Sequence, residues 1–247
     1  MDITSVRYAS VKKLQQNTSE ELLTRLVHKM ARSLGAFRST TQALLNGADE
    51  DPKLRRELLQ EMETELGELQ QLLENVTQLK ALQKGTFHLS RRSVSPSPWL
   101  RQLVARWQRV AKDKGLAWMV NVPDDLPMIE ADLDKLEQSL NNMLSNAVRH
   151  TPPGARVTLA AGSDGNELRV KITSVQPRLT SDEYDRIFDL FYTGEMQGRF
   201  PTGVGLGLHV TRQLIERHGG QLLVVPPDGE RSAVQFEVSL PVTKVMA

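Results

Sequence analysis

The most informative stretch of this sequence is Asn142-Met143-Leu144-Ser145-Asn146-Ala147-Val148-Arg149-His150. Asn142, Asn146 and Arg149 follow one another at spacings of four and three, so on a helix they share one face. The other face carries apolar residues that we expect to be buried: Leu140, Met143, Leu144 and Ala147. Carboxamide oxygens are hard ligands that suit Mg²⁺, and a guanidinium one turn away can bind phosphate oxygens. The stretch therefore indicates either a site for a magnesium-bound phosphate or, as the plainer interpretation, a helix with a solvated polar face.

A glycine-rich run lies downstream, from Gly203 to Leu208, and opens onto a helical pattern. Glycine at alternate positions lets backbone N–H groups approach an anion closely, and the start of a helix favours negative charge. The spacing is not that of a Rossmann dinucleotide motif, because the third glycine follows after one residue rather than two and no strand precedes the run. The run by itself is a weak indication of a phosphate site.

Two seven-residue repeats of apolar residues dominate the N-terminal third of the chain. The first runs through Leu23, Val27, Met30, Leu34, Phe37, Thr41 and Leu44. The second runs through Leu59, Met62, Leu66, Leu69, Leu73 and Val76. Between them Gly47 can end a helix, and Asp51 and Pro52 can begin the next, so the chain is expected to reverse there. Two such seams favour a homodimeric four-helix bundle, with a long hairpin inside a larger monomer as the alternative.

A stretch without periodicity, residues 90–98, contains two prolines and predicts a domain boundary. We place a helical-hairpin domain at 1–88 and an α/β domain at 89–247. In the second domain, Ser97 and Pro98 are expected to start a helix. Further helices are predicted at 132–150, 183–190 and 206–218, and strands at 116–122, 155–161, 167–173, 221–225 and 233–240. This mixture predicts an α+β fold, an α/β sandwich with helices on one face of a sheet.

Three of these segments, in this order and spacing, resemble the sequence boxes of two-component sensor histidine kinases. Residues 142–150 look like the N box, Ile187-Phe188-Asp189-Leu190-Phe191-Tyr192 looks like the F box, and residues 203–208 match the G2 box. A short lid, residues 193–202, lies between the last two. The resemblance covers nearly the whole chain. It implies a Bergerat ATP-binding fold of the GHKL class that uses ATP and Mg²⁺ and closes its lid over the nucleotide.

The same resemblance implies roles for individual residues. Asn146 would hold Mg²⁺, while Asn142 and Arg149 would contact the nucleotide phosphates, Asn142 as part of the catalytic machinery. The other nucleotide-binding residues that it implies are His150, Ser174, Gly203, Gly205, Leu206 and Gly207.

His28 lies where this family carries its phosphoacceptor histidine. It directly follows the seam residue Val27, so we expect it on the exposed flank of the bundle. Imidazole is mostly neutral near pH 7, which leaves a nitrogen lone pair able to attack a γ-phosphoryl group. A single histidine on a helix surface would otherwise indicate nothing. The resemblance makes His28 the expected nucleophile, and it makes the receiver domain of a response regulator the expected partner.

The family pattern fails at two places. The G1 box, Asp-x-Gly-x-Gly, should fall at residues 174–178, but none of its three defining residues is present. Ser174 replaces the aspartate that accepts a hydrogen bond from adenine, and a neutral acceptor contributes roughly 1 kcal/mol less than a charged one. Lys29 stands where the family has an acidic residue beside the phosphoacceptor, and Arg32 stands where a Thr or Asn would support phosphatase activity. A further hypothesis is that these two cations attract an acidic partner or a phosphate.

These departures leave three functions open. The first is an active, divergent histidine kinase. The second is a degenerate pseudokinase or histidine phosphotransfer protein with weak or no ATP binding, and the third is a scaffold. The intact N and G2 boxes favour the kinase narrowly, because a protein that binds no nucleotide has no physical need for a glycine-rich loop beside an Asn-Asn-Arg face.

Composition argues against other classes of protein. The 31 basic and 30 acidic residues leave no charge excess that would indicate nucleic acid or an anionic membrane as a partner. The absence of cysteine excludes disulfides and thiolate metal sites. No apolar run is long enough to span a bilayer and no signal pattern opens the sequence, so we expect a cytoplasmic protein. Because only 27 residues precede His28, its input is expected from a separate sensor protein or from a longer chain.

Overall fold

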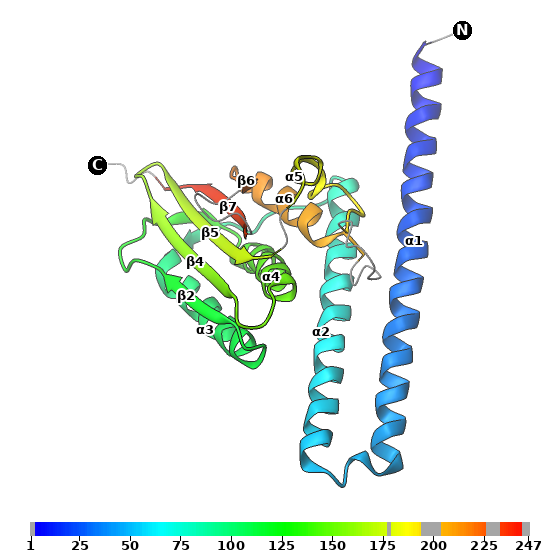
Figure 1. Ribbon diagram of the computed structural model, residues 1–247. Helices are drawn as coiled ribbons and strands as arrows, with labels where there is room; N and C mark the ends of the chain where they lie inside the picture. Colours follow the sequence, from blue (N-terminus) through cyan, green and yellow to red (C-terminus); the bar gives the residue numbers. More distant parts are fainter. Residues whose placement is uncertain (1–2, 177–178, 194–203, 226–232, 244–247) are drawn as a thin grey trace.

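The computed structural model describes residues 3–176, 179–193, 204–225 and 233–243, with side chains from Glu20 onward. The N-terminal part is a long helical hairpin of α1 (Ile3–Ala43) and α2 (Pro52–Gln83) (Figure 1). A π-helical turn, η1 (Leu44–Ala48), follows α1. None of the helices in the described ranges is both long and apolar enough to cross a membrane.

The reversal between the two helices follows the sequence prediction. Gly47 has a φ of +101°, a left-handed conformation that glycine adopts without strain. Asp51 caps α2, because its side chain accepts hydrogen bonds from the backbone N–H groups of Lys53 and Leu54. Pro52 is the first residue of α2, where a missing N–H costs nothing. Local chemistry thus fixes the turn.

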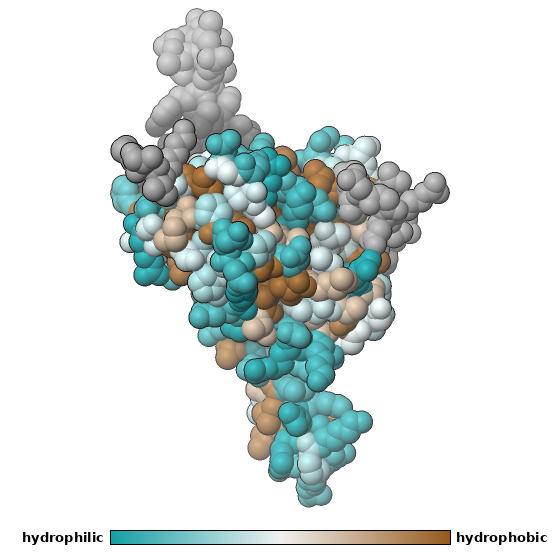
Figure 2. Space-filling model, turned by 90° about the vertical axis from the view of Figure 1, so that its left-hand side faces the viewer, coloured by the Kyte–Doolittle hydropathy of each residue, from teal (hydrophilic) through white to brown (hydrophobic). Residues whose placement is uncertain are grey.

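Many of the large apolar residues in the two seams of the hairpin face solvent in the single chain, whereas Leu69 and Val76 pack against the domain. Leu23 and Leu34 on α1 are each 63% exposed. The other large apolar seam residues that are exposed are Val27, Met30, Leu59, Leu66 and Leu73. Figure 2 shows the lower end of the hairpin projecting beyond the domain, with apolar side chains along one edge of a hydrophilic surface. Exposed apolar surface of this kind marks an interaction site.

The second part of the chain contains one five-stranded sheet, in the order β2-β4-β5-β7-β6. Its strands are β2 (Ala117–Asn121), β4 (Arg156–Ser163), β5 (Glu167–Val175), β6 (Gln221–Val225) and β7 (Ala233–Pro241). The β2–β4 pair is parallel and the other pairs are antiparallel. The helices are α3 (Pro96–Asp113), α4 (Leu133–His150), α5 (Ser181–Arg186) and α6 (Gly207–Arg217). With α3, α4 and α6 against one face of the sheet (Figure 1), the predicted α+β sandwich is confirmed.

The alternation of β5 places one candidate site residue inside the domain. Leu168, Val170 and Ile172 are buried and point toward the helices, as expected for every second residue of a strand with one covered face. Ser174 is the next member of this series and is fully buried. Its hydroxyl therefore lies in the core layer at the end of the strand.

Three local predictions were wrong. α3 begins at Pro96 after Ser95, not at Ser97 and Pro98, because the earlier proline already fits the first helical turn. α5 ends at Arg186, so the predicted helix 183–190 is too long. The structure also has two short strands that were not predicted, β1 (Arg92–Val94) and β3 (Ile129–Ala131), which pair antiparallel. β1 lies inside the predicted linker.

A second apolar cluster joins the hairpin to the domain. Leu72, Leu79 and Leu82 of α2 pack in it against Val210 and Leu214 of α6. Its other buried members are Phe87, Phe191, Val204 and Leu206, with Leu22 and Leu26 of α1 packed at its edge. The domain is therefore docked on the upper part of the hairpin by apolar contacts as well as by the polar contacts described below.

Candidate functional site

The α4 helix presents the predicted polar face. Asp132 caps it by accepting a hydrogen bond from the backbone N–H of Lys135. The apolar residues predicted on its inner side are all buried: Leu140, Met143, Leu144 and Ala147. Their burial fixes the rotation of the helix, so that Asn142 and Arg149 point toward α2 and α6.

Asn142 joins α4 to the start of α6. Its Nδ2 donates to the backbone carbonyl oxygen of Gly207 at 3.3 Å and to Oγ1 of Thr211 at 3.1 Å. A Cβ on Gly207 would lie 3.6 Å from Cγ of Asn142, an ordinary contact distance. The N-box residue and the glycine-rich run, 65 residues apart, therefore meet in one place.

Gly205 occupies a position that only glycine fits. Its φ is +74°, and a Cβ there would lie 2.4 Å from the backbone carbonyl carbon of Phe191. The backbone N–H of Phe191, itself at a φ of +70°, donates to the carbonyl oxygen of Gly205 at 2.9 Å. Leu206 is buried in the apolar cluster, so only its backbone faces the site. Gly203 and most of the predicted lid lie outside the described residues.

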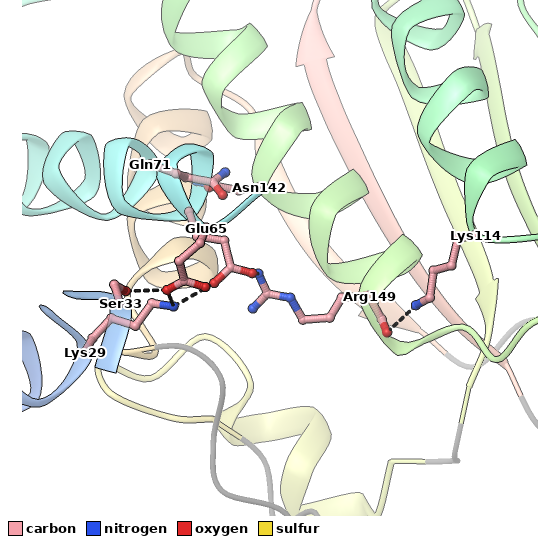
Figure 3. A network of polar contacts seen from close by, with 8 residues as sticks. Lys29, Ser33, Glu65, Gln71, Lys114, Asn142 and Arg149 are labelled. Atoms are coloured by element: carbon pink, nitrogen blue, oxygen red, sulfur yellow. Dashed lines mark hydrogen bonds and ion pairs between the residues drawn. The ribbon is translucent and has the colours of Figure 1, made fainter. Parts of the chain in front are cut away.

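Arg149 forms an ion pair with α2. Its Nη2 lies 2.7 Å from Oε1 of Glu68, whose other oxygen lies 2.8 Å from Nζ of Lys29. Lys29 also contacts Oε1 of Glu65 at 2.7 Å, and Ser33 donates to the same carboxylate (Figure 3). The network runs from α1 through α2 to α4. Lys29 therefore pairs inside the hairpin, and the hypothesis that it attracts an acidic partner is wrong.

The pKa of Glu65 reflects this network. Partial burial opposes ionisation of the carboxyl group, but the hydrogen bonds from Lys29 and Ser33 and the charge of Lys29 outweigh it. The pKa of Glu65 therefore lies below its ordinary value, and the carboxylate remains ionised.

Two amides of α2 also contact Asn142. Nε2 of Gln71 donates to Oδ1 of Asn142 at 2.5 Å, and Oδ1 of Asn75 accepts from Nδ2 of Asn142 at 3.3 Å. Asn75 is buried and also accepts from Nε2 of Gln138 at 3.4 Å. The sequence reasoning missed Glu68, Gln71 and Asn75 as site residues. Their spacing of three and four on one helical face is the only signal that the sequence offers for them.

Asn146 lies one turn after Asn142 and is half-buried. Among the residues that the structure describes, its carboxamide has no hydrogen-bond partner, which leaves an oxygen open to a ligand. The described residues contain no cluster of three His, Asp or Glu side chains that would hold a metal alone. A single amide fits Mg²⁺, because this ion is usually held by one or two protein ligands together with substrate phosphates and water.

His150 is neutral in the folded chain. Burial, and then the charges of Arg149 and Lys114, lower the pKa of His150 to about 4. The ammonium of Lys114 donates to the carbonyl oxygens of Val148 and Arg149 at 2.5 and 2.7 Å, and it fixes the end of α4. His150 is therefore available as a hydrogen-bonding group rather than as a cation.

Ser174 stands at the position of the missing G1 aspartate and is paired with a neighbouring side chain. Its hydroxyl accepts a hydrogen bond from Nε2 of Gln176 at 3.1 Å, and both side chains are buried. The remaining residues of this segment, 177 and 178, lie outside the described residues. Where the family has an ionised acceptor, this chain has two neutral side chains, Ser174 and Gln176, joined by a hydrogen bond.

His28 is exposed on α1, as predicted. Within the described residues it has no hydrogen bond or ion pair, so its ring is open to an incoming group. It lies beside Lys29 in the chain and one helical turn after Arg25. Arg25 donates to the carbonyl oxygen of Phe191 at 3.0 Å and stacks on the ring of Phe191. The helical turn that carries His28 thus contacts the F-box segment through Arg25.

Residues 131–244 match the family described as histidine kinase-, DNA gyrase B-, and HSP90-like ATPase. The chain is 25% identical over 238 residues to the signal transduction histidine-protein kinase BaeS of Escherichia coli (strain K12), covering 96% of this chain and 50% of that protein. It is 25% identical over 245 residues to the adaptive-response sensory kinase SasA of Crocosphaera subtropica, covering 94% of this chain and 63% of that protein. The chain thus spans about half the length of the curated relatives it matches.

Solved structures of histidine kinases are also similar to this chain. Full-length ShkA in complex with AMPPNP is 29% identical, with a TM-score of 0.60, covering 79% of this chain and 40% of that chain. Histidine kinase ThkA in complex with the response regulator protein TrrA is 17% identical, with a TM-score of 0.62, covering 98% of this chain and 67% of that chain, and shares the fold. Residues 131–244 therefore match a histidine kinase-, DNA gyrase B-, and HSP90-like ATPase domain, and the chain as a whole is similar to sensor histidine kinases.

Proposed function

We propose that this chain is the cytoplasmic core of a two-component histidine kinase, which transfers the γ-phosphoryl group of ATP to His28 and then to a response-regulator aspartate. The observation that carries the proposal is the hydrogen bonding of Asn142 to Gly207 and Thr211. It unites two motifs, each a weak indication alone, into one polar site at a helix start. ShkA, which has a similar structure, was solved with the ATP analogue AMPPNP, and this supports a nucleotide as the ligand.

Each residue of the site has its own role in binding the nucleotide. Asn142 and Arg149 contact the phosphates, and the backbone around Gly205 and Gly207 approaches them closely. Asn146 would hold Mg²⁺, which would supply positive charge to neutralise the phosphates. His150 and Ser174, which pairs with Gln176, are the remaining residues that line the nucleotide site.

In the transfer step, a ring nitrogen of His28 attacks the γ-phosphorus atom. An N–P bond forms, the bond between that phosphorus and the bridging β–γ oxygen breaks, and ADP leaves. The proton on the other ring nitrogen passes to solvent, which the exposure of His28 allows. A receiver-domain aspartate then takes the phosphoryl group and restores the imidazole.

The surfaces of the hairpin support two protein partners. The exposed seams around Leu23, Leu34 and Leu66 fit a second copy of the hairpin and so favour a homodimeric four-helix bundle. A response regulator is the other partner, because the similar kinase ThkA was solved with one. A separate sensor protein is a further candidate source of the input signal.

One observation favours a second candidate function. The hydrogen bond from Gln176 occupies one acceptor position of the Ser174 hydroxyl, at the place where the family recognises adenine. A protein that no longer binds ATP, but accepts phosphate on His28 from a phosphorylated regulator, would tolerate this pairing. The alternative is therefore a pseudokinase or histidine phosphotransfer protein.

Incubation with Mg²⁺ and ATP labelled at the γ-phosphate separates these functions. The kinase predicts label on the wild-type chain that is acid-labile, stable to alkali and absent from His28→Gln. If ATP binds but no label appears, the chain is a pseudokinase. Label that reaches His28 only from a phosphorylated regulator selects the phosphotransfer protein. Label that persists on His28→Gln contradicts the assignment of His28 as the acceptor.

A further inference from the structure

We propose that α2 carries a competing set of side chains for the phosphate-binding groups of α4, so that docking of the domain on the hairpin and binding of Mg·ATP oppose each other. The inference rests on the proposed function for the identity of the ligand, a nucleoside triphosphate. Its structural basis is independent of that function. Glu68, Gln71 and Asn75 lie on one face of α2, and each contacts a residue of α4. Figure 3 shows one of these pairs, Gln71 beside Asn142.

The contacts match the chemistry expected of the nucleotide. Glu68 gives the guanidinium of Arg149 a carboxylate oxygen at 2.7 Å, which takes the place of a phosphate oxygen. Gln71 occupies Oδ1 of Asn142 at 2.5 Å, and Asn75 accepts from Nδ2 of the same side chain. Both groups of α4 that the proposed function assigns to the phosphates are therefore already paired. A triphosphate that binds Arg149 therefore competes with Glu68 for the guanidinium.

Lys29 orients the competing carboxylate. Its side chain is only 10% exposed, and it contacts both Glu68 and Glu65. A partly buried Glu68 with two cationic partners is held more firmly than a surface carboxylate, since each partner restricts its rotamers. Lys29 is adjacent to His28 in the chain, so this network also links the phosphoacceptor turn to the nucleotide site.

Competition of this kind is reciprocal. A nucleotide that weakens docking must bind more weakly to the docked chain by the same factor, typically five-fold or more for coupled sites. The triphosphate would also bring negative charge next to Glu65 and Glu68, which opposes the docked arrangement. Release from α2 frees the domain to move relative to His28.

The matched variants are Glu68→Gln and Glu65→Gln. Both remove one carboxylate charge from α2 and one partner from Lys29, but only Glu68 contacts Arg149. Calorimetric titration of the full chain with Mg·ATP measures the dissociation constant of each. The proposal predicts that Glu68→Gln binds Mg·ATP at least about five-fold more tightly than the wild type, and that Glu65→Gln differs from it by less than about two-fold.

A cross-link tests the same competition without changing a charge. The chain has no cysteine, so Asn75→Cys with Gln138→Cys introduces a unique pair across the α2–α4 contact. A short bifunctional methanethiosulfonate bridges the pair through disulfides that a reductant cleaves. Bridging should weaken Mg·ATP binding about ten-fold or more, and reduction should restore it. The control pair is Lys171→Cys with Glu237→Cys, opposite each other within the sheet, whose bridge should leave binding unchanged.

The outcomes separate the inference from the proposed function. Equal Mg·ATP affinity in the bridged and reduced chain, or equal gains from Glu68→Gln and Glu65→Gln, overturns the inference and leaves the kinase assignment standing. Slower bridging of Asn75→Cys and Gln138→Cys in the presence of Mg·ATP supports it. Absence of Mg·ATP binding to the wild type, to Glu68→Gln and to the reduced pair overturns the proposed function and the inference with it.

Discussion

The two ends of the candidate nucleotide site differ in how their polar groups are satisfied. At the phosphate end, Asn142 and Arg149 retain the expected residue types, and they pair with side chains of another domain. At the base end the expected carboxylate is replaced by Ser174, which pairs with Gln176 two residues away. At the phosphate end, the side chains of α2 that pair with Asn142 and Arg149 belong to another domain and can leave. At the base end, Ser174 pairs with a residue of its own domain.

The difference has a physical consequence. Contacts between domains break when the domain moves, so Arg149 and Oδ1 of Asn142 lose their α2 partners without any change in sequence, while Nδ2 of Asn142 keeps Gly207 and Thr211. The Ser174–Gln176 bond lies within the domain, between β5 and the residue that follows it, so it persists in every position of the domain. A nucleotide would therefore gain most of its binding free energy at the phosphate end, and base recognition would be weak.

The largest effect on stability is expected from a substitution that disturbs the backbone at the phosphate end. Gly205→Ala places a Cβ against the backbone of Phe191 at a φ of +74°. Left-handed strain and overpacking each cost about 1–3 kcal/mol, so the free energy of unfolding should fall by about 3 kcal/mol. Urea denaturation measures this, with the exposed, unstrained Gly67→Ala on α2 as the control. A change below 1 kcal/mol would show that the Gly205 loop adapts freely.

A second effect is the pH dependence of stability that comes from the neutral His150. The folded chain protonates His150 only below about pH 4, while the unfolded chain does so below its ordinary value of 6.5. Between these values the unfolded state binds more protons, so the free energy of unfolding falls as the pH is lowered from 6.5 to 4, by up to about 3 kcal/mol. His150→Gln should flatten this part of the profile. Identical wild-type and variant slopes would contradict the burial of His150.

A smaller effect is expected from restoring the base end. Ser174→Asp combined with Gln176→Gly returns an ionised acceptor and removes its internal partner. The gain from a charged over a neutral acceptor is roughly 1 kcal/mol, so Mg·ATP should bind about five- to ten-fold more tightly. Mg·GTP lacks the donor amino group at that position and serves as the control. An equal gain for both nucleotides would show that Ser174 does not face the base.

The smallest effect is expected from loosening Asn142. Thr211→Val keeps the shape of a fully buried side chain but removes the hydroxyl that accepts from Nδ2 of Asn142. The free energy of unfolding should fall by about 1 kcal/mol, because Gly207 and Asn75 still accept from the same amide. Thr211→Ser, which keeps the hydroxyl, is the control. A loss that is the same for both variants would assign the effect to packing.

The sequence predicted that the N-box helix meets the glycine-rich run, but it did not predict the α2 residues that pair with Asn142 and Arg149. Spacing alone placed Asn142, Asn146 and Arg149 on one face, and the family resemblance grouped Gly207 with them, which the structure shows for Asn142. Glu68 and Gln71 could not be found in the same way, because polar residues on an amphipathic helix have the pattern of a solvated face until another element covers them. Lys29 was misinterpreted for the same reason, since its partners lie on a helix 36 and 39 residues away.

The most direct test of the phosphate end is a calorimetric titration of the full chain with ATP, with and without Mg²⁺. The account predicts saturable heat with Mg²⁺ for the wild type, and binding weakened at least ten-fold by Asn146→Ala, because the amide oxygen that holds the metal is lost. Absence of heat at millimolar Mg·ATP in the wild type and in Glu68→Gln would contradict it.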